Sequence, residues 1–252
     1  MLGTSLAFWR AGEFPSGQTA DRFGWSGIFL RSRREQSSRE VRQMKLLRRL
    51  SLFLGTAFLA FSTLGAACAE ELVELVDVDP SLRLDIRYAS DRNFLGFSVY
   101  PEARAFLQRE AAEALKRVNR ELQAEGLGLL ILDAYRPHSV TQLMWDKTPP
   151  AKRAYVADPK KGSRHNRGAA VDLTIVDLSS GKPIPMPSNY DDFSEKAHHS
   201  YMGGTALARA NRKKLREAME RVGFQALDNE WWHYDFKGWE QYPILDKPFS
   251  EI

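Results

Sequence analysis

Two histidines and two acidic residues in the second half of the chain have types and spacings suited to metal chemistry. His165 and Asp172 lie seven residues apart on either side of a glycine, and Glu230 precedes His233 by three residues. Two imidazoles and one carboxylate form a set of three zinc ligands that leaves the fourth coordination position open for water. We therefore predict one zinc ion per chain, held by His165, Asp172 and His233. Glu230 is then the candidate general base, and the pattern favours a zinc hydrolase.

The backbone near these residues must bend before they can meet. Residues seven or three apart on a regular strand point to opposite faces of the sheet. His165 and Asp172 can therefore share a metal only if residues 167–168 form a turn or a bulge. Glu230 similarly has to fall just outside the strand that carries His233. The residues alone leave both points open.

Arg136 is the candidate for stabilising negative charge in the transition state. It follows the apolar run 127–132, which predicts a buried strand, and Pro137 restricts the backbone beside it. A tetrahedral oxyanion needs a cationic or hydrogen-bonding partner besides the metal. The alternative is that Arg136 only forms a structural salt bridge with Asp133.

Apolar periodicity predicts the elements that must position these residues. Residues 82–88 alternate as in a half-buried strand, and Pro101 is predicted to open a helix that stops at Gly126 and whose apolar face includes Leu107. A second long helix is predicted at 205–222, with Leu207 facing inward. Further predicted elements are a short helix at 139–145 and strands at 127–132, 171–174, 224–227 and 231–236. The expected fold is a single α+β domain with a small, mainly antiparallel sheet packed against helices.

The beginning of the chain has the composition of a targeting segment. Residues 44–69 combine a positive start, an apolar run too short to span a bilayer comfortably, and small residues before a cleavage position. We expect cleavage after Ala69 and export to the periplasm, with a retained anchor or a buried helix as alternatives. Because Met44 begins this pattern, residues 1–43 are predicted to be a mis-called upstream extension. The catalytic domain is then 70–252, with no stable membrane insertion after cleavage.

Charge and cysteine content exclude several classes of function. Residues 1–69 contain ten Lys or Arg and four Asp or Glu, which leaves 26 basic and 28 acidic residues in the rest of the chain. The net charge of +4 therefore comes from the leader, and the domain shows no electrostatic sign of binding nucleic acid. The single cysteine, Cys68, is also in the leader, which excludes a disulfide framework or a cysteine nucleophile in the domain.

The combined motifs resemble those of a known enzyme group. Ser163-x-His165-x-x-Gly168-x-Ala170-x-Asp172, together with Glu230-x-x-His233, is similar to the pattern of the zinc D-Ala-D-Ala metallopeptidases, whose fold is shared by the hedgehog signalling domain. The chain resembles in particular the D-alanyl-D-alanine dipeptidases of the vancomycin-resistance type. The segments that carry this second likeness are Tyr135-Arg136-Pro137, Asn93 to Gly96 and Glu230 to Tyr234.

The resemblance implies the same roles for the zinc ligands, Glu230 and Arg136, and adds a substrate pocket. It implies that Asp191, Ser163 and Tyr155 line a small closed pocket and help to receive the free amino group of a dipeptide. For Asp191 the alternative is a solvated loop carboxylate, because unpaired surface aspartates are common. The remaining histidines of the domain are expected to be structural: His138, His198 and His199.

The expected reaction is hydrolysis of the small substrate D-Ala-D-Ala to two D-alanines. Two alternatives stay open, a D,D-carboxypeptidase acting on peptidoglycan stem peptides and a non-catalytic module that keeps zinc and binds peptidoglycan. Glu230 and Arg136 argue against the second, since neither is required merely to hold a metal. An exported enzyme cannot destroy the dipeptide in the cytoplasm, so we expect a role in cell-wall turnover or D-alanine scavenging.

Overall fold

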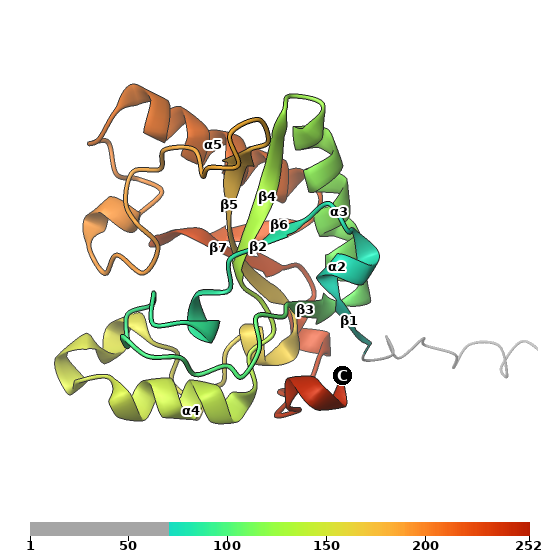
Figure 1. The fold of residues 1–252 in the computed structure, drawn as a ribbon. Helices are drawn as coiled ribbons and strands as arrows, with labels where there is room; N and C mark the ends of the chain where they lie inside the picture. The colour runs from blue at the N-terminus through green and yellow to red at the C-terminus, as the bar shows by residue number, and fades with distance from the viewer. Residues whose placement is uncertain (1–70) are drawn as a thin grey trace, which may run out of the picture. The chain divides into compact units, whose positions relative to one another are not determined.

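The computed structural model describes residues 71–252, and a five-stranded sheet organises them (Figure 1). Its strand order is β2-β4-β5-β7-β6, in which β2 runs parallel to β4 and every other neighbouring pair is antiparallel. A second sheet pairs β1 with β3. The predicted α+β class with a mainly antiparallel sheet is confirmed. The strands are β1 Leu72–Glu74, β2 Arg83–Leu84, β3 Phe106–Gln108, β4 Leu127–Asp133, β5 Ala170–Asp177, β6 Phe224–Leu227 and β7 Glu230–Phe236.

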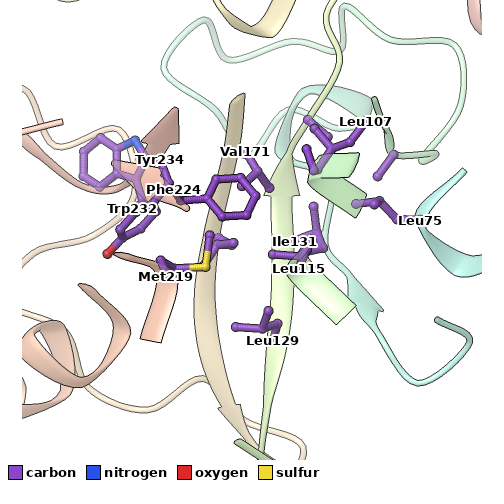
Figure 2. Close-up of a cluster of buried hydrophobic side chains, with 14 of the residues drawn as sticks. Leu75, Leu107, Leu115, Leu129, Ile131, Val171, Met219, Phe224, Trp232 and Tyr234 are labelled. Carbon is purple, nitrogen blue, oxygen red and sulfur yellow. The ribbon is translucent and has the colours of Figure 1, made fainter. Parts of the chain in front are cut away.

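Two long helices cover one face of the main sheet and build the core with it. Val171 on β5 and Ile131 on β4 are fully buried, together with Leu115 of α3 and Met219 of α5 (Figure 2). Because adjacent residues on a strand point to opposite faces, Asp172 is directed away from this core. Within residues 71–252 the α-helices are α2 Leu75–Val78, α3 Arg109–Gln123, α4 His138–Lys147 and α5 Ala206–Arg221.

Three predicted details were wrong. The first strand of the main sheet is only Arg83–Leu84, because the chain turns into a 3₁₀ helix at Arg87–Ala89. The long helix begins at residue 109 and not at Pro101, because Leu107 and its two neighbours pair with β1 and are buried as a strand. Leu207 is 59% exposed, since the buried face of α5 begins one residue later.

The segment between β5 and α5 is fixed to the helix by side chains on the buried face of α5. The Arg212 guanidinium donates to the carbonyl oxygens of His198 and Tyr201, each at 2.8 Å. Asn211 donates to the carbonyl oxygen of Pro185 at 2.9 Å. This segment has little regular structure of its own, and the helix therefore holds both of its ends in place.

The predictions for the leader fall outside the described residues. These are the upstream extension 1–43, the signal peptide 44–69 and its cleavage after Ala69. Among residues 71–252, no helix is long and apolar enough to cross a membrane.

A glycine turn before β5 gives the first testable prediction. Gly168 has a φ of +63°, and a Cβ there would lie 2.3 Å from Leu72 Cδ2 and 3.3 Å from the backbone nitrogen of Gln108. We expect Gly168→Ala to lower the free energy of unfolding by more than the roughly 1–2 kcal/mol typical of a left-handed residue. Gly126→Ala is the matched control, because Gly126 has a φ of +73° and no atom within 4 Å of that Cβ position. Denaturant titrations that give equal losses for the two variants would contradict a sterically tight turn.

Candidate metal centre and active-site pocket

A tight turn brings His165 to the end of β5. Residues His165–Arg167 form a 3₁₀ turn, and Gly168 ends it in the left-handed conformation. The turn is fastened on both sides: the Ser163 hydroxyl accepts from the backbone N–H of His165 at 3.2 Å, and Asn166 Nδ2 donates to the Arg136 carbonyl oxygen at 2.9 Å. The bend that the spacing of His165 and Asp172 requires is therefore present.

Strand pairing brings the third candidate ligand beside the other two. Asp172 on β5 lies directly opposite His233 on β7 in the antiparallel ladder. Asp172 Oδ1 lies 2.9 Å from His233 Nδ1 and 3.4 Å from His165 Nε2, and the two ring nitrogens are 3.2 Å apart. Ligand atoms at 2.0–2.1 Å from a tetrahedral zinc lie about 3.3 Å from one another. The triangle formed by Asp172 Oδ1, His165 Nε2 and His233 Nδ1 thus has the dimensions of one face of a tetrahedral zinc coordination sphere.

His165 and Asp172 each make a hydrogen bond outside the triangle with the polar atom that does not face it. His165 Nδ1 lies 2.6 Å from the carbonyl oxygen of Ala134, so its N–H donates there and Nε2 keeps a lone pair toward the triangle. The Tyr190 hydroxyl donates to Asp172 Oδ2 at 2.8 Å and leaves Oδ1 facing the histidines. Such outer contacts orient metal ligands. The side chains present fit a zinc ion with two imidazole ligands and one carboxylate ligand.

The two imidazoles of the triangle also keep the Asp172 carboxylate charged. Burial alone would raise the pKa of Asp172, but the adjacent imidazoles of His165 and His233 lower it well below its usual value. Asp172 therefore stays ionised although it is buried, as a metal-binding carboxylate must.

Glu230 reaches the pocket through an irregularity in the sheet. It is the first residue of β7, and so does not lie outside the strand as the spacing suggested. The partner of Ala226 is Tyr234, whereas the next residue, Leu227, pairs with Glu230. Residues 231–233 therefore have no partner on β6, and this break lets Glu230 and His233 line the same pocket. Burial raises the pKa of the Glu230 carboxyl, which suits a group that exchanges protons near neutral pH.

Arg136 forms the predicted salt bridge and also lines the pocket. Its Nη2 and Nε donate to Asp133 Oδ2 at 2.6 and 3.2 Å, so the salt bridge exists. Asp133 is fully buried and also accepts from the Tyr100 hydroxyl at 2.8 Å. Arg136 nevertheless lines the pocket, and its guanidinium carbon lies 5.1 Å from the centre of the Tyr88 ring. The salt bridge thus orients a cation that faces the site.

The three residues assigned to substrate binding all line the same pocket, which encloses about 260 Å³. Ser163 lies beside the candidate ligand His165 and is buried. Tyr155 is 39% exposed and stacks on Phe193, with ring centres 4.8 Å apart. Tyr155 therefore lies at the mouth of the pocket, and Ser163 lies deeper.

Asp191 is a wall of the pocket rather than a solvated loop carboxylate. It is the only described non-glycine residue with a positive φ, +57°, and the Tyr88 hydroxyl lies 3.3 and 3.4 Å from its two carboxylate oxygens. Burial and the negative charge of Asp172 raise the pKa of Asp191 to about 8. The Asp191 carboxyl lacks a positive partner strong enough to offset its burial. An incoming cation would supply that partner.

Sequence reasoning missed two aromatic residues of the site. Tyr88 was assigned to a strand and Tyr190 to no role, yet their hydroxyls bond Asp191 and Asp172. Apolar patterning gives no sign of such contacts, because it does not show what the hydroxyl group of a tyrosine touches. The histidines expected to be structural lie outside the pocket: His138, His198 and His199.

Comparison with known proteins shows the family of this chain. The family model described as D-ala-D-ala dipeptidase matches residues 68–252. The "D-alanyl-D-alanine dipeptidase" of Escherichia coli (strain K12) is 35% identical over 180 residues, covering 71% of this chain and 92% of that protein. The protein of the same name from Enterococcus faecium is 34% identical and covers 67% and 92%.

Among solved structures, similarity is weaker. "VanYB in complex with D-Alanine-D-Alanine" has a TM-score of 0.34 and 17% identity, over 54% of this chain and 74% of that one. A similarity of this size carries no weight beside the family match. The family model covers all of the described residues, and so includes the candidate ligands His165, Asp172 and His233 as well as Glu230. The chain therefore belongs to the D-Ala-D-Ala dipeptidase family of metallopeptidases.

Proposed function

We propose that this enzyme hydrolyses free D-Ala-D-Ala to two D-alanines, with one zinc ion held by His165, Asp172 and His233. The observation that carries the proposal is the zinc-sized triangle of ligand atoms, which shares a cavity of about 260 Å³ with Glu230. A pocket of that size is near the lower limit for small-molecule sites, which suits a dipeptide. The family match and the relatives named D-alanyl-D-alanine dipeptidase support the same substrate.

The protein's own residues divide the remaining chemistry. A bound zinc ion acts as a Lewis acid and makes water nucleophilic near neutral pH. Glu230 accepts the proton of the attacking water and later gives it to the leaving amine, which its raised pKa favours. Arg136, oriented by Asp133, donates hydrogen bonds to the oxyanion that forms at the peptide carbonyl.

Asp191 supports a preference for the free dipeptide. Its carboxyl has a pKa of about 8 because it is buried near Asp172, so an ammonium group placed against it would remove an electrostatic cost. A dipeptide with a free amino terminus carries such a group, whereas a peptidoglycan stem has an amide there. We assign Asp191 the role of amino-group anchor, with Ser163 and Tyr155 on the pocket walls.

We also propose that the enzyme acts after export, in cell-wall turnover or D-alanine scavenging in the periplasm. The support is the signal-peptide pattern of residues 44–69. Fractionation that finds the activity in the cytoplasm, on a chain that retains its leader, would overturn this assignment.

The base is tested by Glu230→Gln. This substitution preserves size but removes proton transfer, so we expect kcat to fall by about 10²–10⁴-fold. Zinc content should stay near one per chain, because Glu230 is not among the ligands. Rates of free D-Ala-D-Ala hydrolysis are compared with metal analysis of the same samples. A variant that works at the wild-type rate would refute the mechanism.

Substrate choice is tested with free and N-acetylated D-Ala-D-Ala. Loss of one partner of a buried charge pair costs about 2–5 kcal/mol, so kcat/KM should be at least about 30-fold higher for the free dipeptide. Asp191→Asn should lose most of this preference, mainly through the free dipeptide. Equal or faster turnover of the acetylated substrate by the wild-type enzyme would favour a D,D-carboxypeptidase instead.

A further inference from the structure

The imidazole of His233 is held at both nitrogens, and only one of them faces the triangle of ligand atoms. Nδ1 lies 2.9 Å from Asp172 Oδ1 and 3.2 Å from His165 Nε2. Nε2 lies 2.9 Å from Oδ1 of Asp235, which is neither a proposed metal ligand nor a group of the proposed reaction. A carboxylate only accepts hydrogen bonds, so Nε2 carries the proton. Nδ1, at the same distance from Asp172 Oδ1, is then the nitrogen that faces the triangle, and it has to be deprotonated to bind a metal.

Asp235 is itself well fixed. It lies on β7 two residues after His233, with backbone partners Ala170 on β5 and Gln225 on β6. Its side chain is 15% exposed, and its second oxygen, Oδ2, lies 3.5 Å from Arg164 Nε. The carboxylate is therefore supported by a strand with neighbours on both sides and by a cation.

Arg164 connects this support to the other histidine. Its guanidinium carbon lies 4.6 Å from the centre of the Trp239 ring, which restrains a side chain that is otherwise 46% exposed. Arg164 also directly precedes His165 and is the N-cap residue of the 3₁₀ turn that carries it. The same arginine thus links the backbone of one histidine to the carboxylate behind the other.

We propose that Asp235 is a positioning residue that fixes the tautomer and the ring orientation of His233 for metal binding. The inference rests on the proposed zinc site. Without Asp235, the ring could rotate or carry its proton on Nδ1, and each change removes the lone pair from the triangle. Loss of such outer contacts typically weakens metal binding by 10–100-fold.

The test measures zinc affinity of the purified full chain by competition with a chromophoric chelator. Asp235→Ala should weaken zinc binding by 10–100-fold, whereas Asp235→Asn, whose amide oxygen can still accept from Nε2, should stay within a few-fold of wild type. Asp228→Ala is the matched control, since Asp228 is 93% exposed and lies 3.8 Å from Arg216. If Asp235→Ala fails to fold, Asp235→Ser, with a side chain too short to reach Nε2, replaces it.

The outcomes separate this inference from the proposed function. Wild-type chain that binds no zinc would defeat the zinc site itself. Tight wild-type binding that Asp235→Ala and Asp235→Ser leave unchanged would refute the role of Asp235 alone. Cobalt substitution supplies a second readout, because a changed ligand geometry shifts the d–d absorption spectrum. A shift in Asp235→Ala that Asp235→Asn reverses supports positioning, and a lower unfolding temperature with an unchanged spectrum and affinity refutes it.

Discussion

The site depends on one geometric constraint, the convergence of three ligand atoms from two strands and a turn onto a space the size of one metal ion. The register of the ladder sets Asp172 opposite His233, and the left-handed turn at Gly168 folds His165 back over them. A shift of the β5–β7 register by one residue would send one of the two strand ligands into the core. Sheet packing and metal binding are therefore tied together, since the core residues that alternate with the ligands hold the register.

Burying several acidic groups around one pocket has an electrostatic cost. The groups differ in the partners that offset this cost, and this difference indicates their roles. Asp172 is kept ionised by two imidazoles, and Asp133 is occupied by Arg136 and the Tyr100 hydroxyl. For Glu230 and Asp191, nearby positive groups offset the effect of burial only in part, and the pKa of each carboxyl is raised. Groups whose environments push their pKa values apart are those that exchange protons or receive charge. The pattern supports Glu230 as the base and Asp191 as an anchor.

Much of this could be predicted from the sequence, for identifiable reasons. Histidines and carboxylates at characteristic spacings predicted which three side chains the fold brings together, and the apolar run of β4 correctly predicted the strand that ends just before Arg136. The boundary between β3 and α3 was not predictable, because Leu107 fits both a helical face and a strand paired with β1. Tyr190 and Asp235 were missed because their contacts depend on the side chains brought together by the fold. The break in pairing before Glu230 likewise depends on the strand opposite.

In the proposed site, His165 Nε2, His233 Nδ1 and an Asp172 oxygen hold one zinc ion beside Glu230. Anomalous X-ray diffraction at the zinc absorption edge, on crystals of the zinc-loaded protein, tests it most directly. We expect a single peak about 2.0–2.2 Å from these three atoms. A zinc bound through His233 Nε2, or a peak away from this triangle, would contradict it.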